Sequence, residues 1–294
     1  MRIFLTGATG FIGSAVAAQL IAAGHQVTGP TRSQQGAAVL RAAGVEPLAG
    51  DITEPESLRR GAMASDGVIH TAFNHDFSTF PANCARDGLA IDALARALQG
   101  SSRPLLITSV VGMGADKPGA LAVENHFNAE QPNPRKASEL AGVAALSNNV
   151  NVSFIRLSQV HNRVKQGLIT PLIALAREKG VSAWIDDGET RWSAVHLNDA
   201  AALYLLALNR AAPGSRYHAV AEEGIRLRTL AETIGRLLDL PVKSINAADA
   251  AAHFGWLSKF VALDMSASGA LTQAQLGWQP TGPGLLADLA QMRV

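Results

Sequence analysis

The sequence has little of several features that mark particular classes of protein. Its 294 residues include one cysteine, Cys84, which excludes an internal disulfide and a cluster of thiolate metal ligands. No apolar run approaches the roughly 18 residues that a membrane-spanning helix needs. With 25 lysines and arginines against 24 acidic residues, the net charge of +1 provides no basic field for nucleic acid. We expect a soluble, cytoplasmic protein that binds neither membranes nor nucleic acid.

The first thirteen residues carry the strongest positive signal. An apolar strand, residues 3–5, runs into a loop with glycines at positions 7, 10 and 13, and an alanine-rich helical segment follows. Unpaired N–H groups at the start of such a helix stabilise a pyrophosphate, and glycine lets the backbone approach it closely. The pattern predicts a dinucleotide site whose residues are Gly7, Thr9, Gly10, Phe11, Ile12 and Gly13.

Short apolar runs then alternate with helical segments. Expected strands at 67–70, 104–109 and 152–156 are separated by expected helices at 89–98 and 137–147. This rhythm predicts an α/β fold, a Rossmann-type doubly wound parallel sheet with a smaller C-terminal substrate lobe. We expect residues 1–157 to form the nucleotide-binding domain and residues 158–294 to form the lobe. The two share one core, and residues near 193–220 return to the Rossmann domain.

The end of the second strand predicts which dinucleotide binds. NAD-selective folds place an acidic residue there to bind the adenosine ribose. This chain instead has Thr31, Arg32 and Ser33, which suit a 2′-phosphate because arginine binds phosphate through paired donors. The sequence therefore predicts NADP(H), with a solvated loop arginine as the alternative.

Two further strand ends are expected to contact the cofactor. Asp51 and Ile52 follow the third strand, where they can flank the adenine, although Asp51 can also cap the next helix. Thr71, Ala72 and Phe73 follow the fourth strand, at the carboxyl edge where ligands of such sheets bind.

These residues together resemble the short-chain dehydrogenase/reductase superfamily, in its extended or atypical branch with epimerases, dehydratases and 3β-hydroxysteroid-dehydrogenase-like proteins. The resemblance rests on the glycine loop, the Asp51-Ile52 pair, and the strand ends at 107–109 and 156–157. Residues 195–201 and 276–280 are also similar to stretches of extended members. The resemblance implies a Rossmann fold, a nicotinamide cofactor and hydride-transfer chemistry.

The chain departs from the family at the catalytic tyrosine. Members of the superfamily use a tyrosine, a lysine four residues later, and a serine or threonine. Ser109 and Lys136 match the last two, but Pro132 stands where the tyrosine would be. The remaining tyrosines, Tyr204 and Tyr217, belong to no such pattern. Lys136 either touches the nicotinamide ribose or is only a first-turn helix residue.

Another group must therefore supply the proton if the chain reduces a carbonyl. His75 is our first choice, and His161 and His196 are alternatives; each can equally be a histidine bonded within the fold. We expect Ser109 to bind the substrate oxygen. The other predicted substrate-binding residues are Met113, His161, Arg191 and Trp192, although the aromatic and charged ones can serve only the lobe's own structure.

The predicted function is NADP(H)-dependent reduction of a small or medium carbonyl or imine substrate by an atypical short-chain enzyme. One alternative is an NADP(H)-binding sensor or scaffold without turnover, which the missing tyrosine motivates. A second is a sugar-nucleotide epimerase or dehydratase. His70, His75 and Asp76 have residue types that bind metals but no convincing ligand spacing, so no metal is expected. A homodimer is possible.

Overall fold

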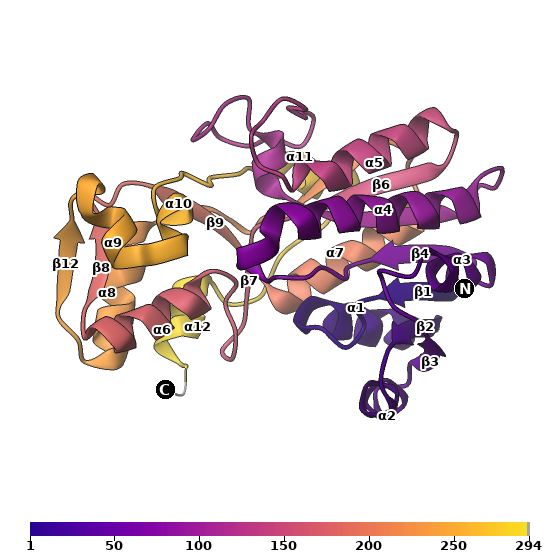
Figure 1. Cartoon of the computed structure of the whole chain (residues 1–294), viewed down its shortest axis with the longest axis horizontal. Coiled ribbons are helices and arrows are strands. Elements are labelled where there is room, and N and C mark those ends of the chain that lie inside the picture. The colour runs from indigo at the N-terminus through magenta and orange to yellow at the C-terminus, as the bar shows by residue number, and fades with distance from the viewer. Residues whose placement is uncertain (293–294) are drawn as a thin grey trace.

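The computed structural model describes residues 1–292 and places a seven-stranded parallel sheet at the centre of the larger body (Figure 1). The strand order is β10 (Arg216–Ala219), β6 (Asn151–Leu157), β5 (Pro104–Val110), β4 (Gly67–His70), β1 (Arg2–Thr6), β2 (Gln26–Thr31) and β3 (Glu46–Ala49). The order reverses direction between β1 and β4, which is where such sheets bind their ligands. The predicted doubly wound Rossmann fold is confirmed.

Helices cover both faces of this sheet because its strands are apolar on both sides. One face packs against α1 (Phe11–Ala22), α2 (Gln34–Ala42) and α7 (Leu197–Arg210). The other packs against α3 (Pro55–Met63), α4 (Phe80–Leu98) and α5 (Lys136–Ser147). Neither face is left to solvent, so chemistry is confined to the ends of the strands.

The smaller body, on the left in Figure 1, is built mostly from residues beyond 158. Its strands are β7 (Gln159–His161), β9 (Arg191–His196) and β11 (Glu222–Arg226) in one sheet and β8 (Ser182–Ile185) with β12 (Val242–Ile245) in another. Its helices are α6 (Ile169–Lys179), α8 (Leu227–Leu238), α9 (Ala250–Phe254), α10 (Ser258–Val261) and α12 (Leu285–Ala290). These elements enclose a separate apolar core around the buried Trp192.

The chain crosses between the two bodies more than once. After β9 it enters α7, which packs against α1, and β10 then adds to the edge of the main sheet beside β6. A later helix, α11 (Ala270–Leu276), lies against β10 before the chain returns to the lobe. No helix within residues 1–292 has both the length and the apolar character needed to cross a bilayer.

Candidate cofactor and active site

The glycine loop at the end of β1 has no room for side chains. Gly7 has a φ of +75°, and a Cβ added to it would lie 2.7 Å from the backbone nitrogen of Ala72. A Cβ on Gly13 would lie 2.1 Å from the Gly7 carbonyl oxygen. Gly10 precedes α1 directly and offers no side-chain cap, so the first N–H groups of the helix stay free for a ligand. Thr9 and Gly10 form its exposed rim.

The end of β2 carries an exposed guanidinium held at one point. The Arg32 side chain is 80% exposed, and its Nε lies 3.2 Å from Asp51 Oδ2. Ser33 Oγ accepts a 3.0 Å hydrogen bond from the Gly36 nitrogen and so caps α2. Thr31 closes the strand next to them. The structure thus brings together the three residues predicted to read the 2′ position.

Asp51 has two roles at the end of β3. It anchors Arg32, and its Oδ1 accepts hydrogen bonds from the nitrogen and hydroxyl of Thr53 at 2.8 and 2.9 Å. Partial burial alone would raise the pKa of Asp51, but these bonds and the charge of Arg32 more than offset it and lower the pKa. The carboxylate is therefore ionised at neutral pH. Its neighbour Ile52 is partly buried beside it.

The three predicted residues after β4 lie against the glycine loop. Thr71 Oγ1 donates to the carbonyl of Thr6 at 2.8 Å, and the Ala72 nitrogen lies 3.3 Å from Thr6 Oγ1. The Phe73 ring lies below the guanidinium of Arg135, whose central carbon is 4.0 Å from the ring centroid. We call the ends of β1, β4 and β5 the carboxyl edge. The Arg135–Phe73 cation–π pair borders this edge on the side of α5.

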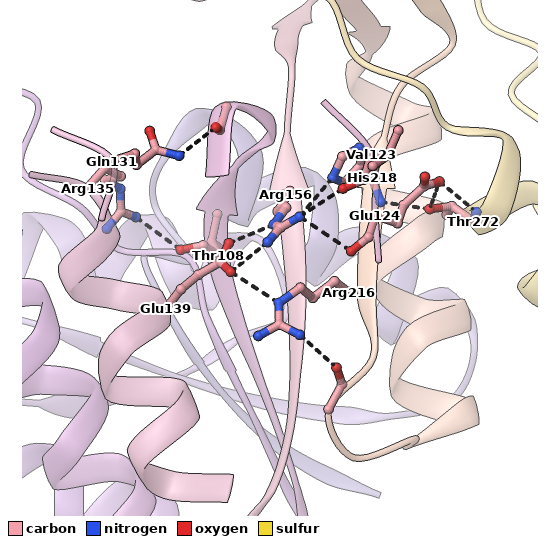
Figure 2. A network of polar contacts seen from close by, with 12 residues as sticks. Thr108, Val123, Glu124, Gln131, Arg135, Glu139, Arg156, Arg216, His218 and Thr272 are labelled. Atoms are coloured by element: carbon pink, nitrogen blue, oxygen red, sulfur yellow. Dashed lines mark hydrogen bonds and ion pairs between the residues drawn. The ribbon is translucent and has the colours of Figure 1, made fainter. Parts of the chain in front are cut away.

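Arg135 belongs to a buried polar chain that the sequence analysis missed. Its Nη1 donates to Asp87 Oδ2 at 2.5 Å and to the Ser138 hydroxyl, and its Nη2 donates to the Thr108 carbonyl at 3.1 Å (Figure 2 shows the latter). Asp87 Oδ1 lies 3.1 Å from His70 Nε2. Burial alone would raise the pKa of Asp87, but the charge of Arg135 and the hydrogen bond from His70 hold it well below its usual range.

The remaining polar contact of His70 joins this chain to β1, because its Nδ1 lies 2.7 Å from Thr6 Oγ1. The polar chain thus crosses from β1 through β4 and α4 to the first turn of α5. Little in the sequence indicated this chain, because Arg135 is one of two adjacent basic residues and Asp87 is one of several polar residues in α4. No local pattern pairs residues 48 positions apart.

Ser109 lies at the end of β5 on the α5 side of the sheet. Its side chain is 1% exposed, and its Oγ has no hydrogen-bond partner among residues 1–292. A buried hydroxyl without a hydrogen-bond partner destabilises the folded state, so the Ser109 hydroxyl is a candidate to bind a ligand. Lys136 begins α5 one position after Arg135 and is partly exposed. The structure therefore gathers Ser109, Lys136 and Phe73 at one edge.

A second buried network supports the segment that joins β5 to α5 (Figure 2). Arg156 is fully buried and forms a two-pronged ion pair with Glu139, at 2.7 and 2.8 Å. Arg156 Nη1 also lies 3.2 Å from His218 Nε2, while His218 Nδ1 lies 2.8 Å from the Ser268 carbonyl. Burial and the charge of Arg156 lower the pKa of His218 to about 3. His218 is therefore neutral, with its proton on Nδ1.

Among the candidate proton donors, His75 lies closest to this edge. It is exposed, and its ring makes an edge contact with Phe73 at a centroid distance of 5.1 Å. Removal of water by the surrounding protein lowers the pKa of His75, and the charges of Arg135 and Lys165 lower it further. Lys165 itself lies over the Phe11 ring of the glycine loop, with Nζ 5.6 Å from the centroid. The sequence analysis did not single out Lys165.

The other candidate histidines lie together between the two bodies. His161 is fully buried, and its Nδ1 is 2.7 Å from Asp288 Oδ2. Burial lowers the pKa of His161, although Asp288 opposes the shift. His196 caps α7 by accepting a hydrogen bond from the Asn198 nitrogen. Both histidines therefore have structural partners, and no group of three or more His, Cys, Asp or Glu side chains within residues 1–292 can hold a metal ion.

Comparison with known proteins places the chain in a family. Residues 3–220 match the family model described as the NAD dependent epimerase/dehydratase family. The chain belongs to this family. An uncharacterized protein of Schizosaccharomyces pombe is 45% identical to this epimerase/dehydratase family member over 99% of this chain and 98% of its own length. The resemblance to the short-chain dehydrogenase/reductase superfamily is thereby confirmed.

A more distant relative has a named reaction. It is the 4-hydroxy-2-methyl-3-oxo-4-farnesyl-3,4-dihydroquinoline-1-oxide ketoreductase of Stigmatella aurantiaca, 25% identical over 87% of this chain and 80% of its own. Among solved structures, the dTDP-glucose 4,6-dehydratase of Streptomyces venezuelae with NAD bound has a TM-score of 0.78 at 19% identity, covering 99% of this chain and 95% of its own. Neighbours of this kind support a nicotinamide cofactor, and the start of α1 at Gly10, which no side chain caps, fits its pyrophosphate.

Three other residues were predicted to bind substrate. Two of them, Met113 and Trp192, are buried, and the third, Arg191, is exposed in the lobe. Met113 is fully buried within the single helical turn Val111–Gly114 that follows β5. Trp192 is buried in the lobe core, where its Nε1 donates to the Leu263 carbonyl at 3.3 Å. Arg191 is exposed at the start of β9. Arg191 and Trp192 therefore lie in a different sheet from Ser109, whereas Met113 lies in the turn that directly follows the strand of Ser109.

Both tyrosines of this protein, Tyr204 and Tyr217, are also buried. Tyr204 hydroxyl lies 2.7 Å from Thr108 Oγ1, and burial raises the pKa of Tyr204 above its ordinary value. Thr108 and Ser109 are consecutive strand residues and point to opposite faces of the sheet. Tyr204 therefore lies on the α7 side, away from the face that carries Ser109, Arg135 and Lys136.

Proposed function

We propose that this protein is an NADP(H)-dependent oxidoreductase that reduces a carbonyl or imine group on a small or medium substrate. The observation that carries the cofactor choice is the end of β2, where an 80% exposed guanidinium lies between two hydroxyl-bearing residues and no carboxylate follows the strand itself. Asp51 holds Arg32 from below at Nε, which orients the guanidinium without burying it. Arginine in this setting matches a phosphate through paired N–H donors.

The site residues and the named ketoreductase among the relatives both support carbonyl reduction as the reaction. When bound, a reduced nicotinamide supplies hydride to the substrate carbon. Ser109 donates a hydrogen bond to the substrate oxygen through its otherwise unpartnered hydroxyl. Lys136 lies on the same face, where it holds the cofactor ribose. Phe73 and the Arg135 guanidinium form the wall of the site beside them.

The proton that completes the reduction comes from His75 or from a water molecule that it orients. Because the pKa of His75 is lowered, its charged form is populated only below the ordinary histidine range. The donor is active when protonated, so kcat should fall as pH rises through a value below about 6.5. His75→Gln should remove this limb of the pH profile.

The cofactor assignment is tested by titrating the purified protein with NADPH and NADH and by repeating both titrations with Arg32→Ala. We expect preference for NADPH in the wild type, and an NADPH dissociation constant raised at least tenfold by the substitution, about 1.4 kcal/mol. The NADH constant should change little. Equal losses for both cofactors would reject the assignment of Arg32.

The reaction is tested by following NADPH absorbance while carbonyl and imine compounds are added. Oxidation by any of them establishes a reductase, and Ser109→Ala should then lower kcat by roughly 10²-fold, as expected for loss of one hydrogen-bond donor at a developing oxyanion. Tight NADPH binding without turnover by any compound would instead support a sensor. Wild-type rates in both Ser109→Ala and His75→Gln would reject the residue assignments.

A further inference from the structure

A chain of aromatic rings connects the end of β4 to the lobe. The aromatic cluster consists of Phe73, His75, Phe77, Phe80, Trp256 and Phe260. It contains four of the nine phenylalanines and one of the four tryptophans of a chain with only 5% aromatic residues. The aromatic residues of this protein are therefore concentrated at one place, where two segments about 180 positions apart meet.

The contacts within the aromatic cluster have the geometry of favourable ring pairs. Phe77 stacks on Trp256 with centroids 4.5 Å apart and planes at 18°, and on Phe80 at 5.3 Å and 30°. Phe260 meets Phe77 edge-on at 5.6 Å. These distances lie in the range in which aromatic pairs attract beyond simple area burial. Phe77 is thus the ring at which the Rossmann body and the lobe touch.

The aromatic cluster starts beside the reacting end of the candidate site. Phe73 follows β4 directly and lies under Arg135, the neighbour of Lys136. His75 comes next and is close enough to both Arg135 and Lys165 for their charges to lower its pKa. The rings therefore run outward from the end of β4, the strand that neighbours β5 and its Ser109.

Trp256 is the outer end of this path. It is 47% exposed, whereas Trp192 and Trp278 are 0% and 2% exposed. Leaving about half of an indole in water forfeits part of the burial that a tryptophan normally contributes. One side of the ring is satisfied by Phe77, and the exposed part remains available to a ligand.

The charges around the aromatic cluster do not suit a nucleoside diphosphate. None of its six side chains carries a fixed charge. The nearest guanidinium, that of Arg135, is already paired with the buried Asp87, and the Lys165 ammonium near His75 lies over Phe11 of the glycine loop. A diphosphate needs free cations or unpaired N–H groups. A planar uncharged ring needs only the stacking surface that the aromatic cluster supplies.

We propose that the aromatic cluster is the substrate-binding surface and that the substrate carries an aromatic or extended conjugated ring next to its carbonyl group. The ring lies against the exposed part of Trp256, which Phe77 holds in place by stacking, and the carbonyl group extends inward toward Ser109. This inference rests on the proposed reductase function and names its substrate class.

Binding is measured first, without turnover. Naphthalene-2-carboxamide and its saturated counterpart decahydronaphthalene-2-carboxamide cannot accept hydride under these conditions, so isothermal titration of the protein with each compares a planar and a non-planar ring of the same carbon skeleton. We expect the aromatic amide to bind about tenfold more tightly, which is the upper end of what one aromatic pair supplies. Equal affinities would overturn the proposal.

Two substitutions separate the aromatic cluster from general surface effects. Trp256→Leu should remove most of the preference for the aromatic amide, whereas Trp184→Leu, a partly buried lobe tryptophan that pairs with Arg228, should leave it intact. Thermal denaturation checks that both variants fold. Retention of the full preference in folded Trp256→Leu would also overturn the proposal.

A turnover experiment with two aldehydes tests the aromatic substrate class separately from the reductase function on which it rests. 2-Naphthaldehyde and decahydronaphthalene-2-carbaldehyde are offered with NADPH, and wild type should oxidise NADPH faster with the aromatic aldehyde, by about tenfold in kcat/KM. Selective amide binding with no NADPH oxidation would reject the reductase function while keeping the aromatic surface. Turnover that favours the saturated aldehyde would reject the surface while keeping the reductase.

Discussion

On the β1 and β2 side of the carboxyl edge, Gly7 and Gly13 leave no room for a side chain, whereas on the β4 and β5 side Asp87, Arg135 and His70 are buried in mutual contact. The glycines of the first side form one short stretch of sequence, although some of the atoms that exclude a side chain there belong to Thr71 and Ala72 after β4. The second depends on pairs separated by 17 to 48 positions. The comparison shows that the phosphate end of the site has a local sequence pattern, whereas the reacting end has none and is assembled only by the completed fold.

The largest effect should come from breaking the buried Arg156–Glu139 ion pair, which joins β6 to α5. Arg156→Met leaves the buried Glu139 carboxylate with Arg216, 3.3 Å away, as its remaining charged partner, and should lower the free energy of unfolding by about 3 kcal/mol, the lower end of the range for a broken buried pair. Urea denaturation measures the loss. The double variant Arg156→Met/Glu139→Leu should recover much of it, and Arg59→Met, at an exposed pair, should leave the urea midpoint unchanged. A stable single variant would refute the role assigned to this pair.

His218 provides a pH-dependent test of the same side. Its folded pKa is about 3, below the value near 6.5 expected for the unfolded chain, so the unfolded state takes up the proton first as pH falls. The stability that His218 contributes is therefore complete above about pH 6.5 and is lost progressively toward pH 3. Between pH 7 and 4 the loss should be on the order of 3 kcal/mol.

The control for this measurement is His218→Gln, which cannot titrate. Its free energy of unfolding should be lower than that of the wild type at pH 7, and should change less between pH 7 and 4. Parallel curves for the two proteins would contradict the assignment of the acid sensitivity to His218.

The glycine loop is tested by a matched pair of substitutions. Gly7 and Gly100 both have a φ of +75°, but a Cβ on Gly7 meets Ala72 and Thr71 within 3 Å, whereas nothing lies within 4 Å of one on Gly100. Both substitutions incur the same backbone strain, about 1 kcal/mol. Gly7→Ala adds overpacking of about 1–3 kcal/mol and should abolish cofactor binding. Equal melting temperatures and equal cofactor affinities for the two variants would argue against a sterically restricted loop.

The smallest expected effect concerns Lys165, which approaches the glycine loop from the lobe. Its Nζ lies over Phe11, the first residue of α1 and thus beside the pyrophosphate position. Lys165→Met should weaken NADPH and NADH alike by about two- to fivefold, an effect that salt screens. Arg163→Met, in the same hairpin, should change neither constant. A loss limited to NADPH would place Lys165 near the 2′-phosphate instead.

The same contrast explains what the sequence could predict. The expected strand at 67–70 coincides with β4, and the one at 104–109 ends one residue before β5 does, because short apolar runs between turn residues define a buried strand well. The glycine loop could be predicted because its glycines follow an apolar strand at fixed spacing and precede a helix, although the contacts that require Gly7 come from Thr71 and Ala72. The roles given to Ser109, His75, Lys136 and the other site residues remain predictions.

The strand β10 and the aromatic cluster could not be predicted in the same way. β10 has only four residues, Arg-Tyr-His-Ala, and two of its side chains are buried or half-buried polar groups that meet Glu139 and Arg156 across the fold. Phe77 and Trp256 each look like ordinary loop aromatics until the lobe folds against the end of β4. Such features depend on contacts between distant segments, which no local pattern records.

The place of β10 in the sheet also has a consequence for how the chain folds during synthesis. The residues up to the end of β6 complete six strands of the sheet, but the edge of β6 stays unpaired until Arg216–Ala219 has been made. An open strand edge invites pairing with another chain. A fragment that stops at residue 157 should therefore aggregate on expression, whereas one extended through α11 should remain in solution.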